Sequence, residues 1–239
     1  MIKPKKSLGQ NFLIDKNVIN TISEVVNIKN KNILEVGPGT GNLTSSLLAR
    51  MPKKFFVVEK DNDLALLLNK KYENQINVIN SDILNLDENT ICDEPLQVFG
   101  NLPYNISTEI LSKWILNIND QNIWFKNLIL MFQKEVADRI ISDFNKSTYG
   151  RLSILANWRL DIKKIIDIRP ESFFPKPRVE SSLLFFSPKK NFHKINDPNN
   201  LEKITRVFFR HRRKMIRKPF NQLFSKKYEI LNKLNIKLN

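Results

Sequence analysis

The residues best suited to chemistry lie in the segment Val98–Tyr104, where a short apolar run ends in Asn101-Leu102-Pro103-Tyr104. The Asn101 side chain carries a carbonyl acceptor. Pro103 restricts Leu102 to an extended conformation, so the Leu102 main-chain carbonyl has a defined direction. Two acceptors beside the flat Tyr104 ring suit a planar base with an exocyclic amine, whose lone pair becomes available when both N–H groups donate hydrogen bonds. An ordinary turn is the alternative, because Asn-X-Pro sequences also form turns.

A glycine-rich turn, Gly37-Pro38-Gly39-Thr40-Gly41, lies between a predicted strand at Asn32–Val36 and a predicted helix. Glycines let the backbone approach a nucleotide-type ligand closely. The spacing G-x-G-x-G differs from the dinucleotide fingerprint G-x-G-x-x-G, and no Lys-Ser/Thr pair follows as in a P-loop. Glu35 at the strand end favours a ligand with an ammonium or sulfonium group over a pyrophosphate. A purely structural turn is the alternative.

Two further acids end predicted strands. Glu59 closes the strand Lys54–Glu59, where a carboxylate can accept both hydroxyls of a ribose. Asp82 closes the strand Ile76–Asp82, where it can accept from the amino group of an adenine ring. Each acid alone is typical of a loop or a helix cap, but three acids at successive strand ends, beside a glycine turn, indicate a ligand site.

The elements that position these residues alternate between strand and helix at about 20–25 residues per unit, which predicts an α/β fold with a mostly parallel seven-stranded sheet and helices on both faces. The remaining strands are expected to end at Asn101 and to span 127–132, 163–168 and 181–187. Asp15 or Asn17, Asp61 and Ser107 are the expected helix caps. Ligands in such sheets bind at the carboxyl ends of the strands, where all the candidate residues fall.

The connection Ser172–Val179 carries two prolines and two phenylalanines. An exposed Phe173 would provide the second face of an aromatic sandwich around an extruded base. Packing into the core is the alternative, and we expect it for one of Phe173 and Phe174.

The C-terminal part has helical periodicity from Leu201 to Lys218. One face is apolar and includes His211, which we interpret as a core residue rather than a ligand. The other face predicts a surface that follows RNA phosphates, formed by Arg206, Arg210, Arg213 and Arg217.

The charge distribution supports a nucleic-acid partner. The 239 residues include 39 Lys and Arg against 24 Asp and Glu, a net charge of +15, and the segment from Lys189 onward holds 15 basic and 3 acidic residues. The remainder is nearly balanced, so the asymmetry favours a polyanion over a merely solvated charged face. We expect one domain at residues 1–187 and a small basic helical domain at residues 188–239.

Several classes of protein are disfavoured. One cysteine, Cys92, excludes an internal disulfide, and two histidines leave little for a metal centre. No apolar run approaches the roughly 20 residues that a membrane span needs, and Met1–Lys6 is not followed by a secretory segment. We therefore expect a cytoplasmic, metal-free protein whose residues Lys3–Lys6 form a mobile basic arm.

The ordered set of motifs resembles the KsgA/RsmA family of ribosomal RNA adenine dimethyltransferases, from about Lys5 to Leu234. Asn101–Tyr104 is similar to the (N/D)-P-P-(Y/F) group of methyltransferases that act on adenine. The motifs are SLGQNFL, EVGPGTGNLT, VVEKD, NSDIL, GNLPYNIS, QKEVADRI, YGRLS, SFFPKPRVESS and FFRHRRKMIR.

The resemblance implies a class I Rossmann-like methyltransferase domain with a small all-α C-terminal domain, shorter here than is common in the family. It implies S-adenosylmethionine as cofactor and dimethylation of N6 of two adjacent adenines in the 3′-terminal hairpin of 16S (small-subunit) rRNA, within immature small ribosomal subunits, by a monomer. The implied cofactor residues are Asn11, Leu13, Gly37, Glu59, Asp82 and Asn101. The implied target-base residues are Asn101, Leu102, Pro103, Tyr104 and Phe173.

Three alternatives remain. A large-subunit (23S) rRNA methyltransferase of the resistance type would share the site, but the QKEVADRI and YGRLS motifs favour the small-subunit enzyme. A non-catalytic RNA-binding assembly or transcription factor on this fold is disfavoured by the intact Glu59, Asp82 and Asn101. A nicotinamide dehydrogenase is disfavoured by the glycine spacing and the basic C-terminal part.

Overall fold

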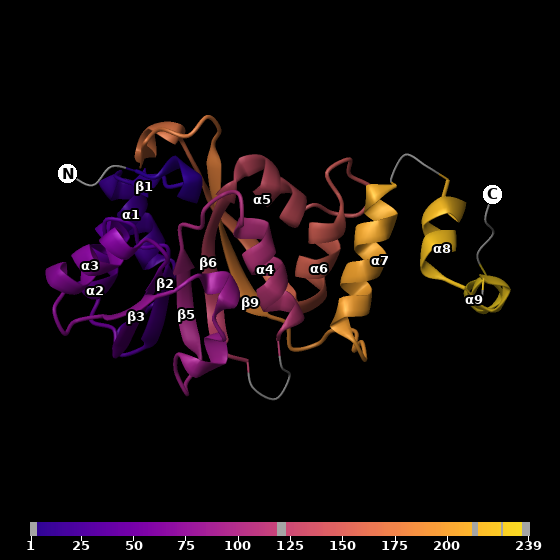
Figure 1. Ribbon diagram of the computed structural model, residues 1–239, viewed down its shortest axis with the longest axis horizontal. Coiled ribbons are helices and arrows are strands. Elements are labelled where there is room, and N and C mark those ends of the chain that lie inside the picture. Colours follow the sequence, from indigo (N-terminus) through magenta and orange to yellow (C-terminus); the bar gives the residue numbers. More distant parts are fainter. Residues whose placement is uncertain (1–3, 119–122, 212–214, 226, 236–239) are drawn as a thin grey trace.

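The computed structural model describes residues 4–118, 123–211, 215–225 and 227–235. These residues form a seven-stranded sheet with the strand order β4-β3-β2-β5-β6-β9-β7 (Figure 1). Neighbouring strands are parallel except that β9 runs antiparallel to β6 and β7. The mostly parallel sheet predicted from the sequence is therefore confirmed. The strands are β2 (Asn32–Val36), β3 (Lys54–Glu59), β4 (Asn77–Asn80), β5 (Leu96–Gly100), β6 (Phe125–Gln133), β7 (Leu160–Ile168) and β9 (Ser181–Pro188).

Helices cover both faces of the sheet, because the central strands are apolar on both sides. Every residue of β2 and β5 is buried. Ile33 packs on one face with α1, α2 and α3, whereas Leu34 packs on the other with α4, α5 and α6. These helices are α1 (Lys16–Glu24), α2 (Asn42–Leu48), α3 (Asn62–Lys71), α4 (Ser107–Leu116), α5 (Lys134–Ile140) and α6 (Arg151–Arg159). Short 3-10 turns occur at η1 (Lys6–Leu8), η2 (Ile83–Asn85), η3 (Glu88–Thr90) and η4 (Pro170–Ser172).

The predicted helix caps are mostly confirmed. Asp15 caps α1 and Asp61 caps α3, each through a side-chain oxygen that accepts from backbone N–H groups. Ser107 is instead the first residue of α4, and the cap position is Ile106. The Ser107 hydroxyl donates back to the Tyr104 carbonyl at 3.2 Å, so it braces the turn that precedes the helix.

A second, two-stranded sheet joins the N-terminal segment to the connection before β9. In it β1 (Phe12–Leu13) runs antiparallel to β8 (Phe173–Phe174), with Leu13 opposite Phe173. Beside it, the Ser172 hydroxyl donates to the Asp15 carboxylate at 3.0 Å. This sheet fixes one end of the N-terminal segment to the main body.

The C-terminal helices correct one prediction. The helix expected from Leu201 to Lys218 is wrong, because α7 (Pro198–Arg210) ends at Arg210 and α8 (Arg217–Leu223) begins separately. Pro219 lies in the first turn of α8, where its missing N–H is tolerated, so it favours a new helix over a continued one. Arg206 and Arg217 therefore lie on different helices, and Arg213 lies outside the described residues.

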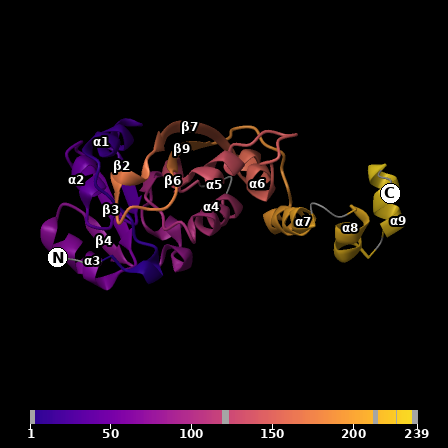
Figure 2. The same cartoon turned by 90° about the horizontal axis from the view of Figure 1, so that it is seen from above.

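The same region extends away from the sheet. Helix α7 contacts α6 through an ion pair between Glu202 and Arg151 at 3.2 Å, and its Phe209 ring contacts Tyr149 just before α6. Glu202 also pairs with Arg206. Helices α8 and α9 (Lys227–Leu234) lie on the far side of α7 from the sheet (Figures 1 and 2). Across the described residues, no helix has the length and apolar character needed to cross a membrane.

Candidate active site

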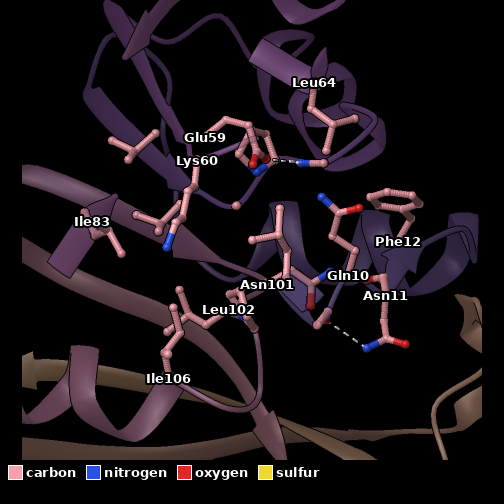
Figure 3. Close-up of a pocket in the computed structure, with 18 of the residues that line it drawn as sticks. Gln10, Asn11, Phe12, Glu59, Lys60, Leu64, Ile83, Asn101, Leu102 and Ile106 are labelled. Carbon is pink, nitrogen blue, oxygen red and sulfur yellow. Dashed lines mark hydrogen bonds between the residues drawn. The ribbon is translucent and has the colours of Figure 1, made fainter. Parts of the chain in front are cut away.

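A pocket opens at the carboxyl ends of β2, β3, β4 and β5, beside the point where the strand order reverses. In Figure 3, Glu59 lies above Asn101 and Ile106 below it, with Gln10 to the right of Asn101. The residues predicted to bind cofactor or base are brought together here, with the exception of Phe173. Those that line the pocket are Asn11, Leu13, Gly37, Glu59, Asp82, Asn101, Leu102, Pro103 and Tyr104.

The glycine turn passes between two neighbours that leave no room for side chains. Gly37 has φ +71°, and a Cβ there would stand 3.2 Å from the Asn101 main-chain oxygen. Gly39 has φ +58°, and a Cβ there would stand 2.7 Å from the Phe12 ring. Only glycine adopts this backbone without strain. The turn thus forms a cradle between the tip of β5 and the N-terminal segment.

Glu59 is held in place by backbone donors at the end of β3. It is 7% exposed, and its two carboxylate oxygens accept from the Gly39 N–H at 3.2 Å and the Asp61 N–H at 2.9 Å. Burial raises the pKa of the Glu59 carboxyl, although these backbone hydrogen bonds oppose the shift. The carboxylate is thereby oriented into the pocket from a fixed position.

Glu35, at the end of β2, is the most buried acid of the pocket. It is 2% exposed, and the Thr44 hydroxyl donates to it at 2.7 Å. Burial raises the pKa of Glu35 to about 8, against the effect of the Thr44 hydrogen bond and with a small contribution from the charge of Glu59. Glu35 is therefore largely protonated near pH 7.

Asp82 has the opposite electrostatic character. One of its oxygens accepts from the Leu84 N–H at 3.0 Å and the other from the Lys60 ammonium group at 2.7 Å. The Lys60 hydrogen bond holds the pKa of Asp82 below its ordinary value despite partial burial. Asp82 is therefore an ionised acceptor at the end of β4.

The tip that follows β5 has a defined orientation. The Asn101 side-chain nitrogen donates to the Asn11 main-chain carbonyl at 2.9 Å. Only the NH₂ group of an amide can donate to a carbonyl, so this contact fixes which end of the Asn101 side chain is the acceptor. The Pro103 carbonyl accepts from the Ile106 and Ser107 N–H groups and so anchors the tip to α4.

Tyr104 is tied to β9, which lies two strands from β5 in the sheet. Its hydroxyl lies 2.5 Å from the Ser181 hydroxyl at the start of β9, and its ring is half-buried. Burial raises the pKa of the Tyr104 phenol, with the Ser181 hydrogen bond acting against it. The ring therefore lines the pocket as a neutral, fixed aromatic surface.

The prediction of an exposed Phe173 ring is wrong. Phe173 is 2% exposed and packs in the core with Leu13 and Leu183, whereas Phe174 is 57% exposed. Adjacent strand residues point to opposite faces, so β8 can present only one of the two rings to solvent. The sequence left open which phenylalanine enters the core, and the structure assigns Phe173 to it.

Sequence reasoning missed the polar contacts that hold the N-terminal segment over the pocket. Lys5 and Gln10 both donate to Asp61, which the sequence identified only as a helix cap. Lys5 was expected in a mobile arm, and these contacts contradict that expectation for Lys5. No local signal reveals them, because the partners are more than 50 positions apart in the chain.

Among the described residues, no group of three or more His, Cys, Asp or Glu side chains is arranged to hold a metal ion.

The parallel sheet with one reversed strand, the glycine turn after β2 and the polar tip after β5 together define a Rossmann-like methyltransferase. The chain belongs to the ribosomal RNA adenine dimethylase family, whose model matches residues 1–239. The predicted family and the methyltransferase class are thus confirmed.

Named relatives agree with this assignment. The chain is 62% identical over 238 residues to ribosomal RNA small subunit methyltransferase A of Pelagibacter ubique (strain HTCC1062), covering 100% of this chain and 90% of that protein. It is 41% identical over 230 residues to the protein of the same name from Wolbachia pipientis subsp. Culex pipiens (strain wPip), covering 94% and 85%.

Two solved structures are similar. A dimethyladenosine transferase from Plasmodium falciparum has a TM-score of 0.76 and 27% identity, with 95% of this chain and 84% of that chain covered. The 23S rRNA methyltransferase ErmE has a TM-score of 0.68 and 22% identity, with 95% and 91% covered. The second similarity concerns the fold alone.

Proposed function

We propose that the protein transfers methyl groups from S-adenosylmethionine to N6 of two adjacent adenines in the 3′-terminal hairpin of 16S rRNA, as a step of small-subunit biogenesis. The observation that carries this proposal is the orientation of Asn101. Its NH₂ group donates to the Asn11 carbonyl, which identifies the other end of the amide as the carbonyl oxygen, the acceptor that an amine substrate requires. Family membership and the small-subunit relatives support the same reaction.

The pocket residues fit the proposed cofactor. Asn11, Leu13 and Gly37 would surround it, Glu59 would accept from the ribose hydroxyls and Asp82 from the adenine amino group. The cradle that a Cβ at Gly37 or Gly39 would fill is the feature that accommodates an extended ligand against the backbone. When bound, S-adenosylmethionine would supply an electrophilic methyl group on its sulfonium.

The chain's own groups would act by positioning. The Asn101 side-chain oxygen and the Leu102 carbonyl would accept from the two N–H groups of the target amine, which favours a pyramidal nitrogen with an available lone pair. Tyr104 offers a fixed ring for stacking, and Phe174 replaces Phe173 as the ring that the β8 connection presents to solvent. Each transfer would replace one N–H of the amine by N–CH₃ and release the proton to solvent. After the second transfer no N–H remains to donate to Asn101, and the product is released.

The basic C-terminal helices support rRNA as the partner. Arg206 and Arg210 lie in α7 and Arg217 lies in α8, so these arginines are on two helices instead of the single helix predicted. A large-subunit rRNA substrate remains the nearest rival, but the likeness to ErmE concerns only the fold. The relative that is 62% identical carries a small-subunit name, which favours the small-subunit substrate.

The test is methylation of undermethylated small-subunit particles by wild-type protein and by Asn101→Ala, with dimethyladenosine measured by mass spectrometry. We expect the substitution to lower the rate by about 10²–10³-fold, the usual cost of one preorganised polar contact to the reacting group. Asn77→Ala is the matched control, because Asn77 donates to the Phe55 carbonyl at the other end of the sheet. A normal rate for Asn101→Ala would contradict the mechanism, and product on large-subunit particles alone would contradict the substrate.

A further inference from the structure

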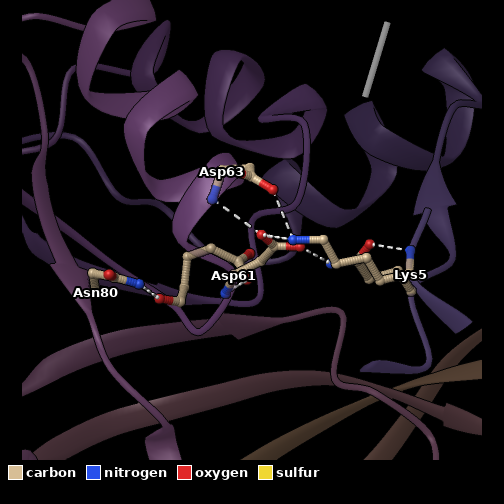
Figure 4. A network of polar contacts seen from close by, with 6 residues as sticks. Lys5, Asp61, Asp63 and Asn80 are labelled. Atoms are coloured by element: carbon tan, nitrogen blue, oxygen red, sulfur yellow. Dashed lines mark hydrogen bonds and ion pairs between the residues drawn. The ribbon is translucent and has the colours of Figure 1, made fainter. Parts of the chain in front are cut away.

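The N-terminal segment is tied to the main body by a buried aspartate. The Asp61 carboxylate accepts from the Lys5 ammonium group at 2.7 Å and from the Gln10 side-chain nitrogen at 2.8 Å (Figure 4). The Asp61 side chain is 1% exposed. Lys5 also donates to the exposed Asp63 at 2.8 Å. These contacts close a segment of chain over one side of the pocket.

Asp61 and Gln10 are each connected to a residue of the site. The Asp61 N–H donates to the Glu59 carboxylate at 2.9 Å. On the other side, Gln10 immediately precedes Asn11, whose carbonyl accepts from the Asn101 side chain. A single residue thus links the placement of Glu59 to the orientation of Asn101.

The two ends of the segment differ in how they are attached. Its far end is the C-terminal one, where β1 pairs with β8 and the Asp15 carboxylate accepts from the Ser172 hydroxyl. Its near end is the N-terminal one, which holds Lys5 and Gln10. At the near end, the attachment consists of side chains, and the Lys5 side chain is 42% exposed. The Gln10 side-chain oxygen accepts from the Lys5 N–H at 2.7 Å, so both donors to Asp61 belong to one small loop. The near end can therefore release as a unit while the far end stays fixed.

The charges favour the closed arrangement. Burial opposes ionisation of Asp61, but the hydrogen bonds from Lys5 and Gln10 outweigh it and hold the pKa of Asp61 below its ordinary value. The same hydrogen bond, donated by Lys5 to Asp61, raises the pKa of Lys5. Both groups are thus charged at neutral pH.

We propose that Asp61 is a positioning residue, and that Asp61, Lys5 and Gln10 form a latch that holds residues 5–13 closed over the cofactor pocket. Closure places Asn11 against the cofactor side of the pocket and orients Asn101 for the target amine. Release of the latch opens a path for exchange of cofactor and product. The inference deepens the proposed function and rests on it.

The test combines binding with kinetics, using Lys5→Gln and Asp61→Asn. The dissociation constant of S-adenosylhomocysteine is measured by calorimetry without RNA, and kcat and KM with small-subunit particles. We expect Lys5→Gln to weaken binding about fivefold, as loss of a partly exposed charged contact does, and to lower kcat because Asn101 loses its orientation. Hydrogen exchange of residues 8–11 should be faster in both variants.

Two controls make the outcome specific. Lys53→Gln removes the same charge from an ion pair of 2.6 Å with Glu94, at the opposite end of the sheet. It should leave the dissociation constant and kcat unchanged. Lys5→Arg keeps the charge and should restore binding and kcat. If Lys5→Gln matches Lys53→Gln in binding, kcat and exchange, the latch is overturned while the proposed function stands. If the wild-type protein fails to bind S-adenosylhomocysteine, both are overturned.

Discussion

The two walls of the pocket are built by different means. The strand wall consists of the carboxyl ends of β2–β5, whose strands are joined by continuous parallel ladders, with β2 and β5 buried throughout. The arm wall, residues 5–13, contains the two-residue strand β1 and is otherwise held by side-chain contacts, which include those to Asp61, Asn101 and Asn42. The strand wall can open only when the sheet unfolds, whereas the arm wall can open locally.

This difference has a functional consequence. Glu59, Asp82 and Asn101 lie at positions set by the global fold, so their spacing persists when ligands leave. The arm contributes Asn11 and Leu13 from a segment that can detach at its near end. A transferase needs both properties, because the strand ends that carry its site must stay in place while cofactor and product exchange.

The largest expected effect comes from the joint between the arm and the core. Phe173→Ala should lower the free energy of unfolding by about 3–5 kcal/mol, because it leaves a cavity beneath Leu13 in the core. Phe174→Ala should change it by no more than about 0.5 kcal/mol, since that ring is exposed, but should raise the KM for the RNA substrate. Urea denaturation and methylation kinetics measure the two effects.

The matched pair separates the two roles of these adjacent phenylalanines. Equal loss of stability in both variants would contradict the assignment of Phe173 to the core. Unchanged RNA kinetics in Phe174→Ala would contradict a contact between the exposed ring and the substrate.

Glu35 in the strand wall should make the stability of the protein depend on pH. Its folded pKa of about 8 exceeds the ordinary value of 4.5, so the native state binds this proton more tightly than the unfolded chain does. The contribution of the Glu35 proton to stability should be complete below about pH 4.5 and should be lost as pH rises toward 8, by at most ~1.4 kcal/mol per pH unit. Glu35→Gln keeps a neutral group beside Thr44, so it should flatten this dependence in denaturation experiments between pH 5 and 8.

Glu94→Gln provides the comparison for that experiment. Glu94 is exposed and pairs with Lys53, whose hydrogen bond lowers the Glu94 pKa. Its substitution should leave the fall in stability between pH 5 and 8 intact. A Glu35→Gln protein with the wild-type slope would show that Glu35 is not the group responsible.

The sequence predicted the strand wall well, for a local reason. Each of its residues lies at or within two residues of the carboxyl end of a strand, and parallel strands bring their carboxyl ends to one edge. Glu59, Asp82 and Asn101 could therefore be placed together from spacing and hydrophobic pattern alone. Which of Phe173 and Phe174 is buried in the core could not be predicted, because it depends on which strand β8 pairs with.

The arm and the C-terminal helices were less predictable. Asp61 was identified as a cap from its local context, but its contacts to Lys5 and Gln10 depend on how residues far apart in the chain meet. The sequence predicts one helix that carries Arg206, Arg210, Arg213 and Arg217, because the periodicity continues beyond Arg210, where α7 ends. In both cases the deciding contacts are tertiary or involve a helix terminus, which a repeating pattern does not encode.

Gly39 is where the two walls touch, so Gly39→Ala tests whether they depend on each other. A Cβ there would lie 2.7 Å from the Phe12 ring in a backbone with φ +58°. We expect a loss of about 1–2 kcal/mol from the left-handed backbone, and weaker binding of S-adenosylhomocysteine because Phe12 and the arm must shift. Adding Phe12→Ala should relieve the clash but not the backbone strain, so the effects of the two substitutions on binding should be non-additive.

Gly150→Ala is the control, because its backbone is extended and a Cβ there would have no neighbour closer than 3.9 Å. Additive effects on binding would mean that the arm and the strand wall are independent at this contact, and that the latch at Asp61 acts alone in closing the pocket.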